Sequence, residues 1–406
     1  VSVGGVELES ASVRLKGNGT FLNSFGAFKK PFKVDLGRGN KGRAVAGNAV
    51  LNLNNLISDF SSMSDAMGYR FYRDAGVPAP RTAYARVRLG IGDRFQRRPL
   101  GLYVVVENLD ADWLAETFAG RDAALFKPVT YELFRDLGTN WASYEGIYDP
   151  KTRLKDTHKA RLMEAARLVT SASDGEFGAR AGDYFDLVEV ARFVAVTSLI
   201  ASYDGFLYNG QNFMMYLDGP SGRFGFIPWD LDQAWGEFPL VGTVKERERA
   251  SIERPWVADH RLLERLFAMD SFRKAYRAEV EGIFGRLFVP GRLHAEVREL
   301  AGLLRASLVD GKISPDVGRR AVDPAEFLHQ ELTAQGALRP EASRMQRVLK
   351  LVTPVLFCLL LWMSIFMSAN YLLQSLAQEK QNRVIEVLLS SVRPVELLIE
   401  IGRAHV

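Results

Sequence analysis

Residues 203–232 decide how the chain is organised, and they read YDGFLYNGQNFMMYLDGPSGRFGFIPWDLD. Two strand-like segments, Phe213–Leu217 and Phe224–Pro228, lie inside this stretch and interrupt a region that is otherwise helical in pattern. Asp204 opens the polar loop before the first segment, and Asp230 follows the second. We therefore expect a hairpin within a helical region, with polar side chains where its strands begin and end.

Strand patterns dominate the first 130 residues. Apolar residues alternate with charged or polar ones in several short segments that turns separate. One helix interrupts them: Ser58 or Asp59 could cap its start, and Gly76 follows its last residue, Ala75. The expected strands are Val13–Lys16, Phe32–Leu36, Leu51–Asn54, Tyr84–Leu89 and Leu100–Val106.

Helical periodicity takes over in residues 150–345. Apolar residues recur at three- and four-residue spacing in five segments, which are Thr157–Ser171, Asp186–Ile200, Arg261–Met269, Phe272–Leu287 and Arg292–Leu308. A sheet-rich part followed by a helical part is an α+β pattern. We expect the first part to span residues 1–130 and the second residues 131–310, with a linker over residues 311–345.

Composition excludes several classes of protein. Hydrophobic residues make up 47% and charged residues 25% of the chain, which is ordinary for a folded globular protein. The 52 basic residues are nearly balanced by 48 acidic ones, so a dedicated nucleic-acid binder is not expected. Cys358 is the one cysteine and the five histidines are scattered, which excludes a disulfide framework and a zinc site.

The acidic and amide residues around the hairpin suit phosphoryl transfer. Asp204 could orient or deprotonate an attacking hydroxyl, while an amide and the acidic pair Asp230 and Asp232 could hold Mg²⁺ on nucleotide phosphates. The spacing from Asp204 to Asn209 equals that of the Asp and Asn in the catalytic loop of protein kinases. On the residues alone, a second interpretation has equal support, in which Asp204 and Asp230 cap turns.

A phosphate-binding turn and its cations are expected in the sheet-rich part. Lys16 and Asn18 belong to a glycine-containing turn that could approach the phosphates. Lys30 and Lys33, on the strand that follows, are candidate cations. Glu107 comes directly after a predicted strand and lies where a hinge between the two parts would be.

Five ordered motifs resemble the spore-coat protein H (CotH) kinase family over about residues 1–290. They are Arg14–Thr20, Lys29–Lys33, Phe71–Arg81, Gly101–Glu107 and Pro228–Asp232. The resemblance implies an atypical, secretory-type protein kinase fold with two lobes. It also implies that the protein uses ATP and a divalent metal, Mg²⁺ or Mn²⁺, to phosphorylate serine or threonine in a protein substrate.

The family's site residues carry over to this chain through these motifs. The resemblance assigns the catalytic aspartate to Asp204 and the metal-binding aspartate to Asp230, with Asp232 beside it. Asn212 precedes an aromatic residue and a strand, as the family's metal-site asparagine does, whereas the kinase spacing favours Asn209. Both asparagines therefore remain candidates for the metal site.

The lysine that contacts the phosphates is assigned to Lys30 first and to Lys33 second. One position departs from the family: where the family usually has Arg-Glu at the start of the first-lobe helix, this chain has Ser64-Asp65. If that glutamate pairs with the nucleotide lysine, the shorter Asp65 would weaken the pairing. A catalytically inactive binding or scaffold protein is therefore the second hypothesis.

The C-terminal segment differs in kind from the rest of the chain. Residues 351–377 form a run of 27 residues without a charge, which is long enough for a transmembrane helix. Leu361–Phe366 and Glu379–Ser391 resemble the permease subunit of ABC-2-type exporters, so an exporter permease fragment over residues 346–398 is a third hypothesis. Residues 399–406 read like a translated sequencing adapter, which indicates a truncated or chimeric gene.

Location and partners follow from the start of the chain and from the family resemblance. The chain opens without Met or a signal-peptide pattern, and we expect it to start inside a domain of a longer protein. The resemblance implies a bacterial protein of the cell envelope, secreted in its full-length form or held at the membrane by the C-terminal helix. Its expected partners are ATP and a protein substrate, and the sequence indicates nothing about oligomeric state.

Overall fold

The computed structural model describes residues 1–308 except 5, 9–10, 18–23, 25–27, 38–47, 60, 92, 94, 121 and 258. The chain divides into two compact units, residues 1–324 and 325–406, and every described residue belongs to the first. The expected linker, the uncharged run, the permease-like segment and the final eight residues, 399–406, all lie outside the described residues. Within the described part, no helix combines the length and the apolar character needed to cross a membrane.

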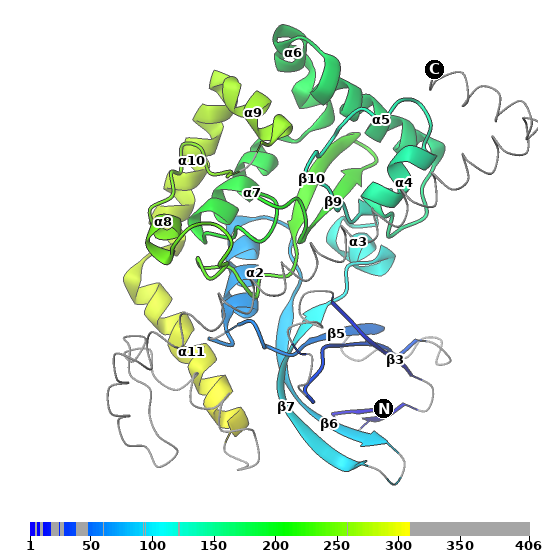
Figure 1. Ribbon diagram of the computed structural model, residues 1–406, viewed down its shortest axis with the longest axis vertical. Helices are drawn as coiled ribbons and strands as arrows, with labels where there is room; N and C mark the ends of the chain where they lie inside the picture. The colour runs from blue at the N-terminus through cyan, green and yellow to red at the C-terminus, as the bar shows by residue number, and fades with distance from the viewer. Residues whose placement is uncertain are drawn as a thin grey trace, which may run out of the picture. The chain divides into compact units, whose positions relative to one another are not determined.

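A five-stranded antiparallel sheet lies within residues 1–110, which we call the sheet half (Figure 1). All five predicted strands are confirmed, with ends that differ by a few residues, and they lie in the order β3-β4-β5-β7-β6. Their bounds are Ser12–Leu15 (β3), Phe32–Asp35 (β4), Val50–Asn54 (β5), Thr82–Ile91 (β6) and Phe95–Glu107 (β7). A short pair that the sequence did not predict, β1 (Ser2–Val3) and β2 (Val6–Glu7), precedes them.

Helix α2 (Ser64–Ala75) begins later than predicted. The predicted cap Asp59 lies five residues upstream, where its carboxylate accepts hydrogen bonds from the backbone amide and the hydroxyl of Ser64. Asp59 thus bonds to the first residue of the helix from a loop position five residues upstream. The predicted end is confirmed, because Gly76 follows the helix with a φ of 89°, a left-handed conformation that glycine adopts without steric cost.

A second, three-stranded antiparallel sheet lies within residues 111–308, which we call the helical half, and its order is β10-β9-β8. Both predicted hairpin strands are confirmed as β9 (Phe213–Asp218) and β10 (Arg223–Pro228). The third strand, β8 (Ala123–Phe126), was not predicted, because four residues are too few to show alternation. It pairs with β9, so it belongs to the helical half.

The five predicted helices of this half are confirmed within two residues at each end. They are α5 (Asp156–Ser171), α7 (Leu187–Leu199), α9 (Arg261–Ala268), α10 (Asp270–Leu287) and α11 (Pro290–Leu308). Four more helices were not predicted: α3 (Ala111–Thr117), α4 (Ala142–Tyr148), α6 (Asp174–Tyr184) and α8 (Val244–Glu248). Three of these are short, and α6 contains three glycines, which lower helix propensity.

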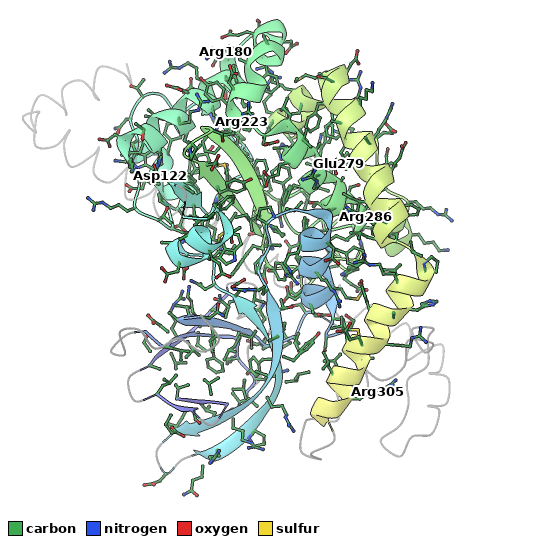
Figure 2. All side chains as sticks on the ribbon, turned by 180° about the vertical axis from the view of Figure 1, so that it is seen from behind. Asp122, Arg180, Arg223, Glu279, Arg286 and Arg305 are labelled. Carbon is green, nitrogen blue, oxygen red and sulfur yellow. The ribbon has the colours of Figure 1, made fainter. Side chains whose placement is uncertain are left out.

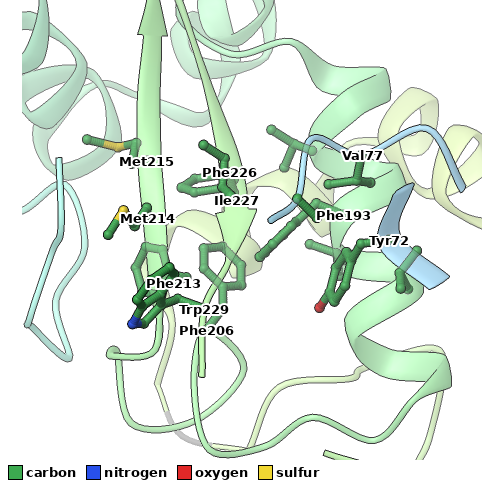
Figure 3. Packing of buried hydrophobic residues seen from close by; sticks show 14 of the residues in the cluster. Tyr72, Val77, Phe193, Phe206, Phe213, Met214, Met215, Phe226, Ile227 and Trp229 are labelled. Atoms are coloured by element: carbon green, nitrogen blue, oxygen red, sulfur yellow. The ribbon is translucent and has the colours of Figure 1, made fainter. Parts of the chain in front are cut away.

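Aromatic rings from the polar loop, helix α7 and the two hairpin strands pack against one another beneath the hairpin. Phe206, in the polar loop after α7, lies with its ring centroid 5.1 Å from that of Phe213 and 4.7 Å from that of Phe226 (Figure 3). Phe193 of α7 contacts the same ring at 5.2 Å. Such offset and edge-to-face contacts stabilise beyond the area they bury, so the polar loop rests on a rigid base.

Helix α11 runs beside α2, on the far side of the molecule from the three-stranded sheet (Figures 1 and 2). Arg70 of α2 pairs with Glu299 of α11 at 3.1 Å, and Arg292 of α11 pairs with Asp74 of α2. The last described helix, α11, therefore returns to helix α2 of the sheet half.

Candidate functional site

The ends of two hairpin strands bring the predicted acidic residues to one edge of the three-stranded sheet. Phe213, the first residue of β9, pairs with Pro228, the last residue of β10. The backbone amide of Trp229 donates to the carbonyl oxygen of Asn212 at 3.2 Å, so the segment before β9 and the segment after β10 stay together beyond the strands. Asn212 and Asp230 both have left-handed φ angles, 54° and 56°, which Asn and Asp tolerate better than most residues. The loop that opens with Asp204 therefore ends beside Asp230.

Three amide side chains hold Asp204, and the longest of their hydrogen bonds, 3.4 Å, comes from Gln211. The amide nitrogen of Asn209 donates to a carboxylate oxygen of Asp204 at 2.6 Å, and that of Asn212 donates to the Asp204 carbonyl oxygen at 3.0 Å. The two asparagines that the sequence left as alternatives thus both contact Asp204. The side-chain oxygen of Asn209 is buried and finds no hydrogen-bond partner within the described part of the chain. A buried oxygen of this kind is costly unless a ligand or water meets it.

Lys16 reaches the same site from the sheet half. Its ammonium donates to the side-chain oxygen of Asn54, at the end of β5. The amide nitrogen of Asn54 then donates to Asp65 of α2 at 2.9 Å. Lys16 also lies 5.7 Å from the centroid of the Trp229 ring, a cation–π distance. Asp65 is therefore linked to a lysine, but through an amide rather than in a direct ion pair.

The other predicted lysines have different partners. The ammonium of Lys30 donates to the carbonyl oxygen of Ser24, and that of Lys33 donates to the side-chain oxygen of Asn108 at 2.8 Å. Burial lowers the pKa of Lys33. Asn18 lies outside the described residues. The geometry thus favours Lys16, which was the third candidate lysine, over Lys30 and Lys33 as the lysine beside the acidic residues.

Glu107 has a structural role in this geometry. One oxygen of its buried carboxylate accepts from the side chain of Arg81 at 2.9 Å, and the other accepts from the Trp113 ring nitrogen at 3.2 Å. These contacts join the end of β7 to α3, where the sheet half meets the helical half. Glu107 also lines a pocket of about 420 Å³ whose lining includes neither Asp204 nor Asp230.

Burial and mutual repulsion raise the pKa values of Asp65, Asp204 and Asp232. Burial, with a further contribution from the charge of Asp230, raises the pKa of Asp65 to about 7 and raises that of Asp232 well above its usual value. Burial also raises the pKa of Asp204. Desolvation lowers the pKa of Lys16, although the charges of Asp230 and Asp65 oppose this shift. Carboxylates this close repel one another, so a bound cation would stabilise their ionised forms.

The oxygen donors suit a magnesium ion that a nucleotide brings with it. Asp230 and Asp232 offer carboxylates, and Asn209 or Asn212 could offer an amide oxygen. Among the described residues, no three His, Cys, Asp or Glu side chains lie close enough to form a complete metal site. Mg²⁺ rarely needs one, because it usually takes one or two protein carboxylates and completes its shell with phosphate oxygens and water.

Sequence reasoning missed three residues of the site. Asn54 lies between Lys16 and Asp65, and the hydroxyl of Tyr69 accepts a hydrogen bond from the backbone amide of Asp230 at 2.8 Å. Lys127, directly after β8, is the third. A polar residue at the end of an alternating strand was a signal for Asn54. Tyr69 and Lys127 carried no signal, because their roles depend on how distant segments meet.

The fold and site define an α+β protein in which a lysine and a cluster of buried carboxylates meet between a sheet half and a helical half. Residues 13–314 match the family model described as CotH kinase protein, and the chain belongs to that family. The chain is also 25% identical, over 251 residues, to the inner spore coat protein H of Bacillus subtilis (strain 168). That match covers 61% of this chain and 65% of the relative, which is less than two thirds of the relative's length.

Proposed function

We propose that the protein is an ATP-dependent protein kinase of the CotH type, which transfers the γ-phosphoryl group to a serine or threonine hydroxyl of a protein. The observation that supports this most is the meeting of Asp204 and Asp230 at one sheet edge, opposite the Lys16–Asn54–Asp65 chain of hydrogen bonds. Membership of the CotH kinase family supports the same reaction. The nucleotide would lie between the sheet half and the helical half.

The order of elements supports a two-lobed, kinase-like fold. In the five-stranded sheet, helix α2 follows the third strand along the chain, and the chain leaves the sheet half after the fifth strand. Protein kinases place a lysine on the third strand and pair it with a glutamate on the helix that follows. Here the third strand, β5, carries Asn54, and the lysine comes from the end of the first strand at Lys16. A lysine–amide–carboxylate chain would thus replace the direct ion pair.

Asp204 would act on the acceptor hydroxyl. Its carboxylate is partly buried and is held by Asn209, so it is oriented before a substrate arrives. Burial raises its pKa, which strengthens it as a proton acceptor. Asp230 would hold the Mg²⁺ or Mn²⁺ that accompanies ATP, together with Asp232 or an asparagine oxygen. When bound, that metal neutralises charge on the phosphate oxygens.

A second candidate is a member of the family that binds nucleotide without transferring phosphate. The position of Asp65 supports this candidate, because the carboxylate meets Asn54 and the Leu231 amide rather than Lys16 directly.

The location of the protein is likewise a proposal. The relative is a spore coat protein of a bacterium, and we infer an association with the spore coat or cell envelope for this chain too.

Transfer of label from γ-³²P-ATP to a serine-rich acceptor protein, with Mg²⁺ or Mn²⁺, tests the proposal. We expect labelling by the wild type and its near-complete loss in Asp204→Ala and Asp230→Ala. Asp112→Asn, an exposed substitution in the first turn of α3, is the matched control and should label like the wild type. Wild-type labelling no greater than that of Asp204→Ala would instead support the non-transferring candidate.

A further inference from the structure

The three-stranded sheet brings Lys127 to the edge where the acidic residues emerge. Phe126, the last residue of β8, pairs with Met215 of β9, and Met215 pairs with Phe226 of β10. Strands β8 and β10 each run antiparallel to β9, so they run in the same direction. Both end at the same edge of the sheet. Lys127 therefore leaves β8 where Asp230 leaves β10.

The backbone after Lys127 is fixed to the loop that carries Asp204. The amide of Lys127 donates to the carbonyl oxygen of Tyr148 at 2.9 Å, and the amide of Thr130 donates to that of Gly210 at 3.0 Å. A side chain on Gly210 would place its Cβ 1.8 Å from the Thr130 carbonyl oxygen, so the two backbones touch directly. The position of Lys127 is thus set by the same loop that positions Asp204.

The Lys127 side chain is half-buried, and its ammonium makes no hydrogen bond or ion pair with any residue that the structure describes. Desolvation lowers its pKa, and the negative charge of Asp230 acts against that shift. Taking an ammonium out of water without a hydrogen-bonding partner is unfavourable, which is expected where a ligand completes the site.

The loop itself supplies no cation to a phosphate group. Residues 204–212 contain no Lys or Arg, and Lys16 approaches from the sheet half. A triphosphate bound between the halves would therefore meet carboxylates on the helical side unless a cation from another segment were present. Among the described residues, Lys127 is placed at that edge by the sheet register, and Asp230 is the largest charge acting on it.

We propose that Lys127 is a second phosphate-binding cation of this site, contacting the nucleotide's phosphates from the helical half while Lys16 contacts them from the sheet half. The proposal rests on the proposed function, because it assumes that the site takes a nucleoside triphosphate. Ammonium–phosphate contacts are charge-assisted and depend on the charge more than on a fixed geometry. Arginine at this position should therefore substitute in part, and an uncharged side chain should not.

Calorimetric titration of the full chain with MgATP and, separately, with adenosine tests this role. We expect Lys127→Met to weaken MgATP binding by about 10- to 100-fold, the loss typical of a hydrogen bond to a charged group, and to leave adenosine binding unchanged. Lys127→Arg should recover most of the MgATP affinity. Lys151→Met is the matched control, because Lys151 lies near Lys127 but pairs with Asp149, and its MgATP affinity should stay near wild type.

Three outcomes are distinguishable. A loss of MgATP affinity in Lys127→Met with unchanged adenosine binding supports the proposal. Equal MgATP affinity in wild type and Lys127→Met overturns the role of Lys127 and leaves the proposed kinase function standing. Absence of MgATP binding by the folded wild type overturns both.

Discussion

Asp65 accepts a hydrogen bond from the backbone amide of Leu231 at 3.0 Å, and this bond ties helix α2 to the segment that carries Asp230. The other carboxylate oxygen of Asp65 accepts from Asn54, which accepts in turn from Lys16. One buried carboxylate thus links the sheet half, α2 and the acidic segment of the helical half. Substitutions along this chain of bonds should affect both stability and activity.

The titration of the Asp65 carboxyl should be visible in the pH dependence of the free energy of unfolding. Its pKa in the folded protein is about 7, against 3.8 for an unperturbed aspartate, because burial and the charge of Asp230 disfavour the ionised form. Between about pH 4 and pH 7 the folded state therefore binds more protons than the unfolded chain, and the contribution of Asp65 to the free energy of unfolding falls as pH rises. In urea denaturation, wild type should lose more stability than Asp65→Asn over this range. Parallel pH profiles for the two proteins would show that the Asp65 carboxyl does not titrate in this way.

The sequence and the structure favour different lysines as the one that contacts the nucleotide. The sequence favours Lys30, and the structure favours Lys16. We expect Lys16→Met to lower kcat/KM for ATP by about 100- to 1,000-fold, the effect typical of removing one preorganised electrostatic contact to the reacting group. Lys30→Met, which removes a contact to the Ser24 carbonyl, should cause a much smaller loss. The two variants have the same substitution, Lys16 directly after β3 and Lys30 two residues before β4, and are compared in the same steady-state assay. A larger loss in Lys30→Met would restore the original assignment.

The amide that holds Asp204 should tune the pH profile of the reaction. The 2.6 Å hydrogen bond from Asn209 favours the ionised carboxylate and lowers a pKa that burial has raised. Removing it in Asn209→Ala should raise the pKa of Asp204 further, so the acidic limb of the kcat/KM profile should move to higher pH. The profile of Asn212→Ala should move less, because Asn212 donates to the backbone carbonyl oxygen of Asp204 and contributes less than Asn209 to the pKa of the carboxylate. An unchanged acidic limb in Asn209→Ala would mean that Asp204 is not the titrating base.

The contact between Gly210 and Thr130 should be sensitive to a single methyl group. Gly210 has a φ of 63°, and an added Cβ would lie 1.8 Å from the Thr130 carbonyl oxygen. Strain and overpacking together should make Gly210→Ala destabilising by at least about 2 kcal/mol. Gly175→Ala, in helix α6 with open space around the new Cβ, should instead stabilise by about 0.5–1 kcal/mol. Thermal unfolding of both variants measures the difference, and similar melting temperatures would contradict the close approach.

The strands and long helices could be predicted because their patterns are local. Phe32–Asp35 alternates, and α10 and α11 repeat apolar residues over many turns. What failed was short, rich in glycine as α6 is, or dependent on long-range contacts. Strand β8 is four residues long. The carboxylate of Asp59 accepts hydrogen bonds from Ser61 and from Ser64, so it holds a turn upstream and the helix begins only at Ser64.

The same distinction holds for the site. The spacing from Asp204 to Asn209 and the position of Asp230 after a strand are visible in the sequence, and the structure brings all three to one edge of a sheet. The choice among lysines was not visible, because Lys16 reaches Asp65 only through Asn54, and those three residues lie on separate elements. The position of Lys127 near Asp230 depends on the register in which β8 pairs with β9, and no local pattern in the sequence specifies that register.

The measurement that tests the central claim most directly is mass spectrometry of an acceptor protein after incubation with the wild type and MgATP. The account predicts that serine or threonine residues gain the mass of one phosphate, and that the gain disappears in Asp204→Ala and Asp230→Ala. A gain of the mass of an adenylate would contradict phosphoryl transfer and assign the same carboxylates to nucleotidyl transfer. No modification by a folded wild type that binds MgATP would contradict the catalytic claim altogether.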